Sequence, residues 1–120
     1  MRFLIISALL VCIAGSTRGD GKFTDLGVQI SNSTMIGTTF GPGRVYSVMR
    51  GHPAKLLAFD LQSGKLLQSL PLDGAEGAWN ACTASDGSIY VGTDPAGHLY
   101  RYLPGEPSVH DLGTPPADQH

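Results

Sequence analysis

The sequence predicts an all-β fold made of repeated four-stranded antiparallel sheets, and three observations favour it. Glycine (16) and proline (8) are abundant, whereas charged residues make up only 15% of the chain. This composition favours short strands joined by turns over long helices. Short β-branched runs alternate with turn residues, and no segment after residue 16 shows sustained helical periodicity. Similar segments also recur at intervals of about 43 residues, close to the length of one β-propeller blade.

The first sixteen residues have the pattern of a secretory signal peptide. Arg2 supplies a positive charge, an apolar run covers residues 3–14, and small residues occupy positions 14–16. The apolar run is shorter than the roughly 20 residues that a helix needs to span a bilayer. We therefore expect residues 1–16 to be removed, a secreted or periplasmic location, and no stable membrane span in the mature chain, residues 17–120.

Three pairs of similar segments define the repeat. Their members share a glycine–β-branched–tyrosine pattern, a leucine with an aromatic residue, and the tripeptide Asp-Leu-Gly. The pairs are 43–48 with 87–92, 55–59 with 98–102, and 25–27 with 111–113. The first two pairs are offset by 44 and 43 positions, and the third by twice 43. A constant interval of this kind indicates a repeat architecture.

Turn residues divide each repeat into four strands. Gly41-Pro42-Gly43 and the segment 62–65 separate strands in the first repeat, where Gly64 is expected to need a positive φ. Asp86-Gly87 is a strong hairpin signal in the second repeat. The expected strands are 34–40, 44–49, 56–61 and 66–70, then 79–84, 89–93, 98–103 and 108–112.

These strands predict two blades of a β-propeller, residues 34–72 and 78–113, preceded by an outer strand of another blade at 23–30. A β-sandwich is the alternative fold, because it also uses short strands with frequent turns. A sandwich gives no reason for a repeat of about 43 residues, so the propeller is favoured. Two blades fall short of the roughly 4–8 that close a ring. We therefore expect residues 17–120 to form an incomplete ring, the N-terminal portion of a longer propeller, or else to oligomerise.

Two segments resemble the repeat of PQQ-like, quinoprotein-type propellers, a superfamily related to WD40 and YVTN propellers. The stretch LAFDLQSGK at 57–65 is similar to a strand that ends Ala-x-Asp and turns through Gly-Lys. GSIYVGT at 87–93 is similar to the Gly-x-Val-Tyr-Val-Gly strand of the same superfamily. The resemblance implies blades throughout the mature chain. It implies no cofactor, because Gln68 stands where cofactor-binding members carry a tryptophan, and no quinone or calcium site is recognisable.

The loops on one face of the predicted blades carry the candidate ligand-binding residues. Cationic, acidic, imidazole and aromatic side chains gather there, a mixture that suits a sugar or another small polar ligand. These residues are Arg50, His52, Glu76, Trp79, Asn80, Asp94 and His98. The alternative is that they are solvated loop residues and that Trp79 packs between blades.

Other kinds of site have little support in the sequence. His52, His98 and Asp94 lie on matching loops, but no tight spacing indicates a metal, and we assign none. The net charge of −2 and the lack of a basic stripe argue against nucleic-acid binding. Cys82 is expected to be a buried strand residue. No catalytic motif is present.

The sequence thus favours a non-catalytic scaffold that binds a protein partner or a carbohydrate. The alternative is a fragment of a propeller enzyme, either a carbohydrate-active lyase or hydrolase or a quinoprotein-like oxidoreductase. The fold does not decide between them, because propellers carry many unrelated functions.

Overall fold

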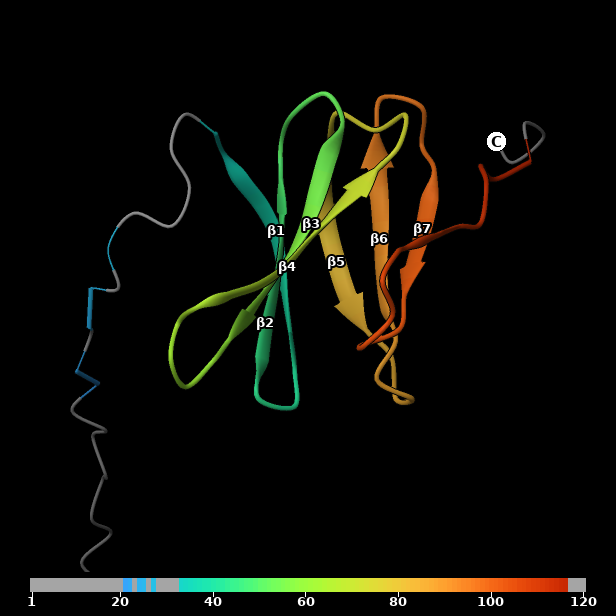
Figure 1. Ribbon diagram of the computed structural model, residues 1–120. Helices are drawn as coiled ribbons and strands as arrows, with labels where there is room; N and C mark the ends of the chain where they lie inside the picture. Colours follow the sequence, from blue (N-terminus) through green and yellow to red (C-terminus); the bar gives the residue numbers. More distant parts are fainter. Residues whose placement is uncertain (1–20, 23, 26, 28–32, 117–120) are drawn as a thin grey trace, which may run out of the picture.

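Two four-stranded antiparallel sheets make up the fold of the computed structural model, which describes residues 21–22, 24–25, 27 and 33–116 (Figure 1). Within each sheet the strands follow chain order, so each sheet is a simple meander. The first sheet contains β1 (Met35–Gly41), β2 (Arg44–Met49), β3 (Ala54–Asp60) and β4 (Leu66–Leu72). The second contains β5 (Gly77–Thr83), β6 (Ile89–Asp94), β7 (Leu99–Tyr102) and β8 (His110–Asp111). The prediction of an all-β chain of four-stranded sheets is confirmed.

Short polar turns join neighbouring strands at the places that the sequence indicates. Gly64 has a φ of 68°, as expected for the β3–β4 hairpin. In that hairpin the backbone N–H of Ser63 donates to the Asp60 carboxylate at 2.6 Å. In the β5–β6 hairpin the N–H of Ser88 donates to Asp86 at 2.9 Å. Each aspartate thus satisfies a turn donor that the strand ladder leaves unpaired.

Strand boundaries differ from the expected ones by two residues at several places: β3 begins at Ala54, β4 ends at Leu72 and β5 begins at Gly77. In β5 the register slips between Ala78 and Asn80 and leaves Trp79 as an extra residue. The final strand is reduced to His110–Asp111, whereas the prediction was 108–112. Pro107 lies just before this segment and lacks the N–H that a longer ladder would need.

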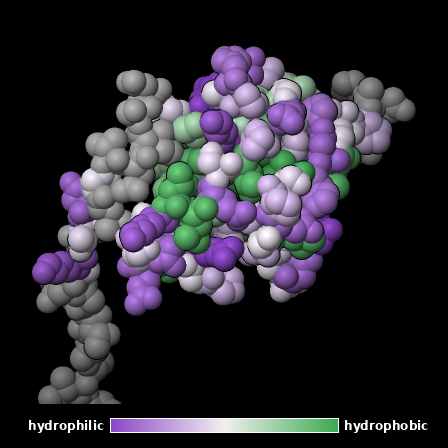
Figure 2. All heavy atoms as spheres, in the orientation of Figure 1, coloured by the Kyte–Doolittle hydropathy of each residue, from purple (hydrophilic) through white to green (hydrophobic). Residues whose placement is uncertain are grey.

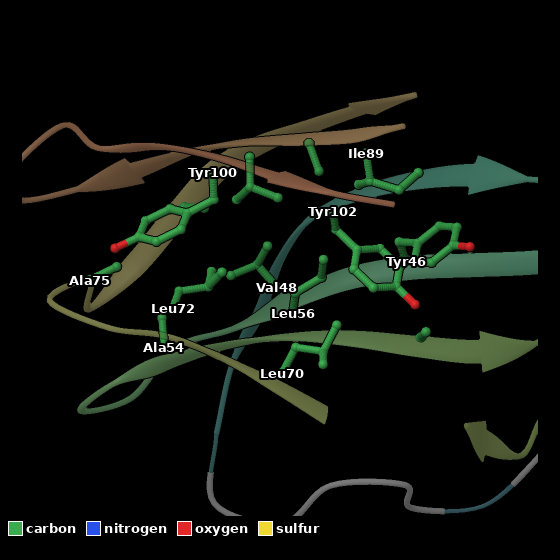
Figure 3. Close-up of a cluster of buried hydrophobic side chains, with 14 residues drawn as sticks. Tyr46, Val48, Ala54, Leu56, Leu70, Leu72, Ala75, Ile89, Tyr100 and Tyr102 are labelled. Carbon is green, nitrogen blue, oxygen red and sulfur yellow. The ribbon is translucent and has the colours of Figure 1, made fainter. Parts of the chain in front are cut away.

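The hydrophobic core lies between the two sheets (Figure 3). Alternate residues of each strand point into it, as the period of two requires. The tyrosine rings of Tyr46 (β2) and Tyr102 (β7) meet there with centroids 6.0 Å apart and a tilt of 60°. The other large members are Val48, Leu56, Leu70, Leu72, Ile89, Val91 and Tyr100, while Ala54, Ala58, Ala75, Ala78 and Ala81 fill the narrower parts.

The first strands of the two sheets, β1 and β5, lie closest together. The hydroxyls of Thr39 and Thr83 share a hydrogen bond of 2.9 Å, and Thr83 also donates to the carbonyl of Phe40 at 2.7 Å. A Cβ on Gly37 would stand 3.1 Å from the backbone of Asn80, so the missing side chain permits this approach. The β1 edge of the first sheet and the β5 edge of the second are therefore joined by direct polar contacts.

Further polar contacts tie the later strands together across the sheets. The Tyr102 hydroxyl donates to the side-chain oxygen of Gln68, and the amide nitrogen of Gln68 donates to the carbonyl of Glu106 at 3.1 Å. The Tyr100 hydroxyl donates to the backbone carbonyl of Asp73. These buried hydroxyls are satisfied by the other sheet or its loops, which fixes how the two sheets sit together.

Some expectations fall outside the described residues. The signal peptide at 1–16 does so entirely, and the outer strand at 23–30 does so for the most part. In the described part of the chain, no helix has the length and apolar character needed to cross a membrane. Cys82 lies on β5 as expected, but the prediction that it is buried is wrong: its side chain points away from the core and is exposed.

Candidate functional site

Three loops meet at one end of the sheets, at the top of Figure 1. They are the β2–β3 loop (50–53), the β4–β5 crossover (73–76) and the β6–β7 loop (95–98). Backbone hydrogen bonds hold the crossover between its neighbours. The N–H of Gly51 donates to the carbonyl of Glu76 at 3.1 Å, and the N–H of Glu76 donates to the carbonyl of Asp94 at 2.9 Å. The crossover therefore positions Glu76 between the other two loops.

Arg50 and Asp94 form an ion pair across this end, with 3.7 Å between Nη2 and Oδ2. The two residues come from different sheets, and their side chains remain 46% and 31% exposed. The pair passes directly over Gly77. A Cβ there would lie 2.9 Å from an Asp94 oxygen and 3.2 Å from Nε of Arg50. The absence of a side chain at Gly77 thus makes room for the pair.

His52 and Glu76 form a second pair, with 3.6 Å between Nδ1 and Oε1. Both side chains are well exposed. His52 and Glu76 each border both of two adjacent shallow hollows. One hollow, of about 290 Å³, is bounded by Ser33, Thr34, Arg50, Gly51, His52 and Glu76. The other, of about 340 Å³, is bounded by His52, Pro53, Asp73, Gly74, Ala75 and Glu76.

Ser33 and Thr34 also border the first hollow, although no sequence pattern marks them as ligand-binding residues. The Ser33 hydroxyl donates to the carbonyl of Arg50 at 2.7 Å, and the N–H of Arg50 donates to the carbonyl of Thr34 at 3.0 Å. These contacts fix the backbone from which the Arg50 side chain extends. A contact between residues 17 positions apart could be found only from the β1–β2 register.

Trp79 is the most exposed large apolar side chain near this end, at 74%. It is the extra residue of the β5 irregularity, two positions along the strand from Gly77. Trp79 does not pack between the two described sheets, because its ring stands in solvent. Asn80 follows it, also exposed, with its backbone against Gly37.

His98 does not join the Arg50–Asp94 pair. Its Nδ1 lies 2.8 Å from an oxygen of Asp111, and its ring stacks on Tyr100 with centroids 6.0 Å apart. The backbone N–H of Gly113 and the His98 imidazole lower the pKa of the Asp111 carboxyl. His52 and His98 thus engage different carboxylates. Among the described residues, no group of three histidine, cysteine or acidic side chains is arranged to hold a metal ion.

The loop end therefore brings together Arg50, His52, Glu76 and Asp94. Trp79 and Asn80 lie further along β5, and neither borders the two hollows. Hydrogen-bonding groups of both signs, two hollows and an exposed aromatic ring can bind a polar ligand without any covalent chemistry. Comparisons with family models, with curated proteins and with solved structures give no match to this chain.

Proposed function

We propose that the chain is a secreted or periplasmic β-propeller repeat protein that binds a carbohydrate on its loop end. The export part of the proposal rests on Arg2 and the apolar run at 3–14. The propeller part is supported by the repeat of about 43 residues and by two meanders of four strands in the same order.

The way the sheets pack supports a propeller over a sandwich. Aligning the strand ladders matches Val45 with Ile89 and Phe59 with Tyr102. Ile89 and Tyr102 face the other sheet, whereas Val45 and Phe59 lie on the opposite side of their sheet, away from the core. The two sheets therefore stack front to back. A two-fold sandwich would bury the same face of both repeats, while front-to-back stacking is what successive blades require.

The ligand-binding part rests on one observation: Arg50, His52 and Glu76 border polar hollows at the loop end, and an exposed tryptophan lies on β5, the strand that follows the crossover. Sugars present hydroxyls for charged hydrogen-bonding groups and an apolar ring face for an aromatic side chain. The Arg50–Asp94 ion pair and the His52–Glu76 contact are both long and partly exposed, so their groups keep hydrogen-bonding capacity for a ligand. We infer that Trp79 stacks on a sugar ring while Arg50 and Glu76 bond its hydroxyls.

The test uses the single tryptophan of the chain as its own probe. A panel of neutral and acidic oligosaccharides is titrated into the purified protein while Trp79 fluorescence is recorded. We expect a saturable change for at least one of them. Arg50→Gln should weaken that affinity about tenfold or more, because it removes a charged hydrogen-bond donor.

The matched control is Arg44→Gln. Arg44 is at the start of β2, at the opposite end of the first sheet, so its loss should leave the affinity unchanged. The proposal fails if no oligosaccharide changes the fluorescence, or if both substitutions weaken binding equally. Calorimetric titration of Trp79→Ala checks the stacking role: the variant should lose affinity while keeping its β-sheet circular dichroism.

A further inference from the structure

Within the part of the chain that the structure describes, each sheet has a second face, on the side away from the core, on which no other sheet packs. On the first sheet, this free face is formed by Met35, Thr38, Phe40, Val45, Ser47, Met49, Lys55, Leu57 and Phe59. Ser47 and Leu57 lie on this side but are buried. On the second sheet, the free face is formed by Asn80, Cys82, Tyr90, Gly92, Leu99 and Arg101. Both sets follow from strand alternation, because their neighbours in sequence point into the core.

The free face of the first sheet is apolar and hollowed. Phe40 is 63% and Met35 is 49% exposed, and a cavity of about 260 Å³ lies among Met35, Thr38, Val45, Ser47, Phe59, Asp60, Leu61 and Gly64. On the side of the molecule shown in Figure 2, hydrophobic atoms gather across the middle, between hydrophilic loops at the two ends. Contiguous exposed apolar surface of this kind marks an interaction site.

The repeat register identifies what fits these faces. In the repeat alignment, the core-facing side of the second sheet is equivalent to the free face of the first sheet. Likewise, the core-facing side of the first sheet is equivalent to the free face of the second sheet. In particular, Tyr46 matches Tyr90 and Leu56 matches Leu99. Four positions therefore carry similar side chains in the free and the packed faces, because Val45 also matches Ile89 and Phe59 matches Tyr102. Three positions differ: Gly92 stands for Val48, Arg101 for Ala58 and Ser47 for Val91.

Particular contacts of the packed interface have equivalents in the free pair. The ring contact of Tyr46 with Tyr102 would be repeated by Tyr90 of one copy and Phe59 of the next. Arg101 lies opposite Tyr90 in the β6–β7 ladder and pairs within the chain with Asp86, at 3.7 Å. Asp60 follows Phe59 at the rim of the apolar cavity.

We propose that this chain associates head to tail with further copies of itself, the free face of the first sheet of one copy packing on the free face of the second sheet of the next. Such a contact is heterologous, so it continues until the assembly closes or remains open. Rings of roughly 4–8 four-stranded sheets would take about two to four copies. The association uses the sheet faces, not the loop end, and does not depend on carbohydrate binding.

The experiment measures the molar mass of the purified chain by sedimentation equilibrium over a range of concentrations. We expect a concentration-dependent rise to between about two and four chains. Phe59→Asp and Leu99→Asp each place a carboxylate on one free face, and each variant alone should remain a monomer. Ser85→Asp adds the same charge in the exposed β5–β6 turn, off both faces, and should associate as the parent chain does.

Mixing the two variants provides the decisive readout. The Phe59→Asp chain keeps an unaltered second-sheet face, and the Leu99→Asp chain keeps an unaltered first-sheet face. The mixture should therefore form a heterodimer that associates no further. Cys82 reports which face is covered, because its thiol is exposed on the second-sheet face. In the mixture its alkylation should slow in the Phe59→Asp chain and remain fast in the Leu99→Asp chain.

Two outcomes overturn the proposal: a monomer at every concentration, or a mixture that stays monomeric while the parent chain associates. Association of the Leu99→Asp variant alone also overturns it, because that result means a face-to-face contact of two first sheets. Circular dichroism verifies that each variant is folded. Met35→Asp, at a more exposed position of the same face, replaces Phe59→Asp if the latter unfolds.

Discussion

Gly77 shows how a single residue can control the candidate site without contacting a ligand. Nothing in its sequence neighbourhood separates it from Gly74, which has open space around its α-carbon. Its importance comes from the Arg50–Asp94 pair that lies over it, formed by two side chains 44 positions apart in the sequence. The sequence predicts both charged residues on matching loops of neighbouring repeats. The structure puts Arg50 in the β2–β3 loop and Asp94 at the end of β6, and only the folded chain shows that they pair.

Gly77→Ala should displace this pair, because the new methyl group would lie within 3.2 Å of both partners. We expect oligosaccharide affinity to fall about as much as in Arg50→Gln. The free energy of unfolding should change by less than about 1 kcal/mol, since exposed ion pairs contribute little to stability. Fluorescence titration and urea unfolding measure the two quantities.

Gly92→Ala is the control, because no atom lies within 4 Å of its would-be side chain. Equal affinities for the parent chain and the Gly77→Ala variant would show that the position of Arg50 is unimportant for binding. A large loss of stability would instead mean that Gly77 supports the fold.

Among the elements, the hairpins were predictable and the irregularities were not. Turn residues act locally, so Gly41-Pro42-Gly43, 62–65 and Asp86-Gly87 located three hairpins from the sequence alone. The extra residue at Trp79 depends on how β5 pairs with β6 and packs beside β1, which is not local information. For the same reason, the expected burial of Cys82 is wrong. The sequence predicts the strand correctly but not the side of the sheet on which the Cys82 side chain lies.

The β5–β6 hairpin should make stability depend on pH. The Ser88 N–H, with a smaller contribution from Arg101, lowers the pKa of Asp86 below its usual value of 3.8. A carboxyl whose pKa is lower in the folded chain stabilises it above the unfolded pKa, and that contribution is lost as the pH falls through the folded pKa. The urea midpoint should therefore fall from about pH 5 downwards, and less steeply in Asp86→Asn.

Unfolding curves recorded from neutral pH to strongly acidic pH test this. Ser85→Asn changes the same turn without removing a carboxylate, and its acid limb should match that of the parent chain. Asp60 and Asp111 also have lowered pKa values, so Asp86→Asn should flatten the acid limb only in part. Parallel profiles for Asp86→Asn and the parent chain would contradict the role given to the turn.

At the scale of the whole molecule, the two sheets should unfold as one unit. They share one core, and the side chains of Tyr100 and Tyr102 are satisfied by the crossover at Asp73 and by Gln68 of β4. Leu56→Ala leaves a cavity in the first sheet and should cost about 2–5 kcal/mol. Hydrogen exchange at the Val91 amide, in the second sheet, should accelerate to the same extent.

The control is Leu61→Ala, whose side chain is 58% exposed, and which should change stability by no more than about 0.5 kcal/mol. If Leu56→Ala left exchange at Val91 unchanged, the sheets would be independent folding units, and the shared core would contribute little to either.

Gly37 has a consequence for curvature. At the inner edge the spacing of the sheets is set by a missing side chain and by Ala78 and Ala81, whereas towards the later strands Tyr100 and Tyr102 separate them. The difference in size between these residues on β5 and β7 therefore helps to set the angle between the two sheets. In the proposed propeller, a larger residue at position 37 would reduce that angle and change the number of sheets that close the ring.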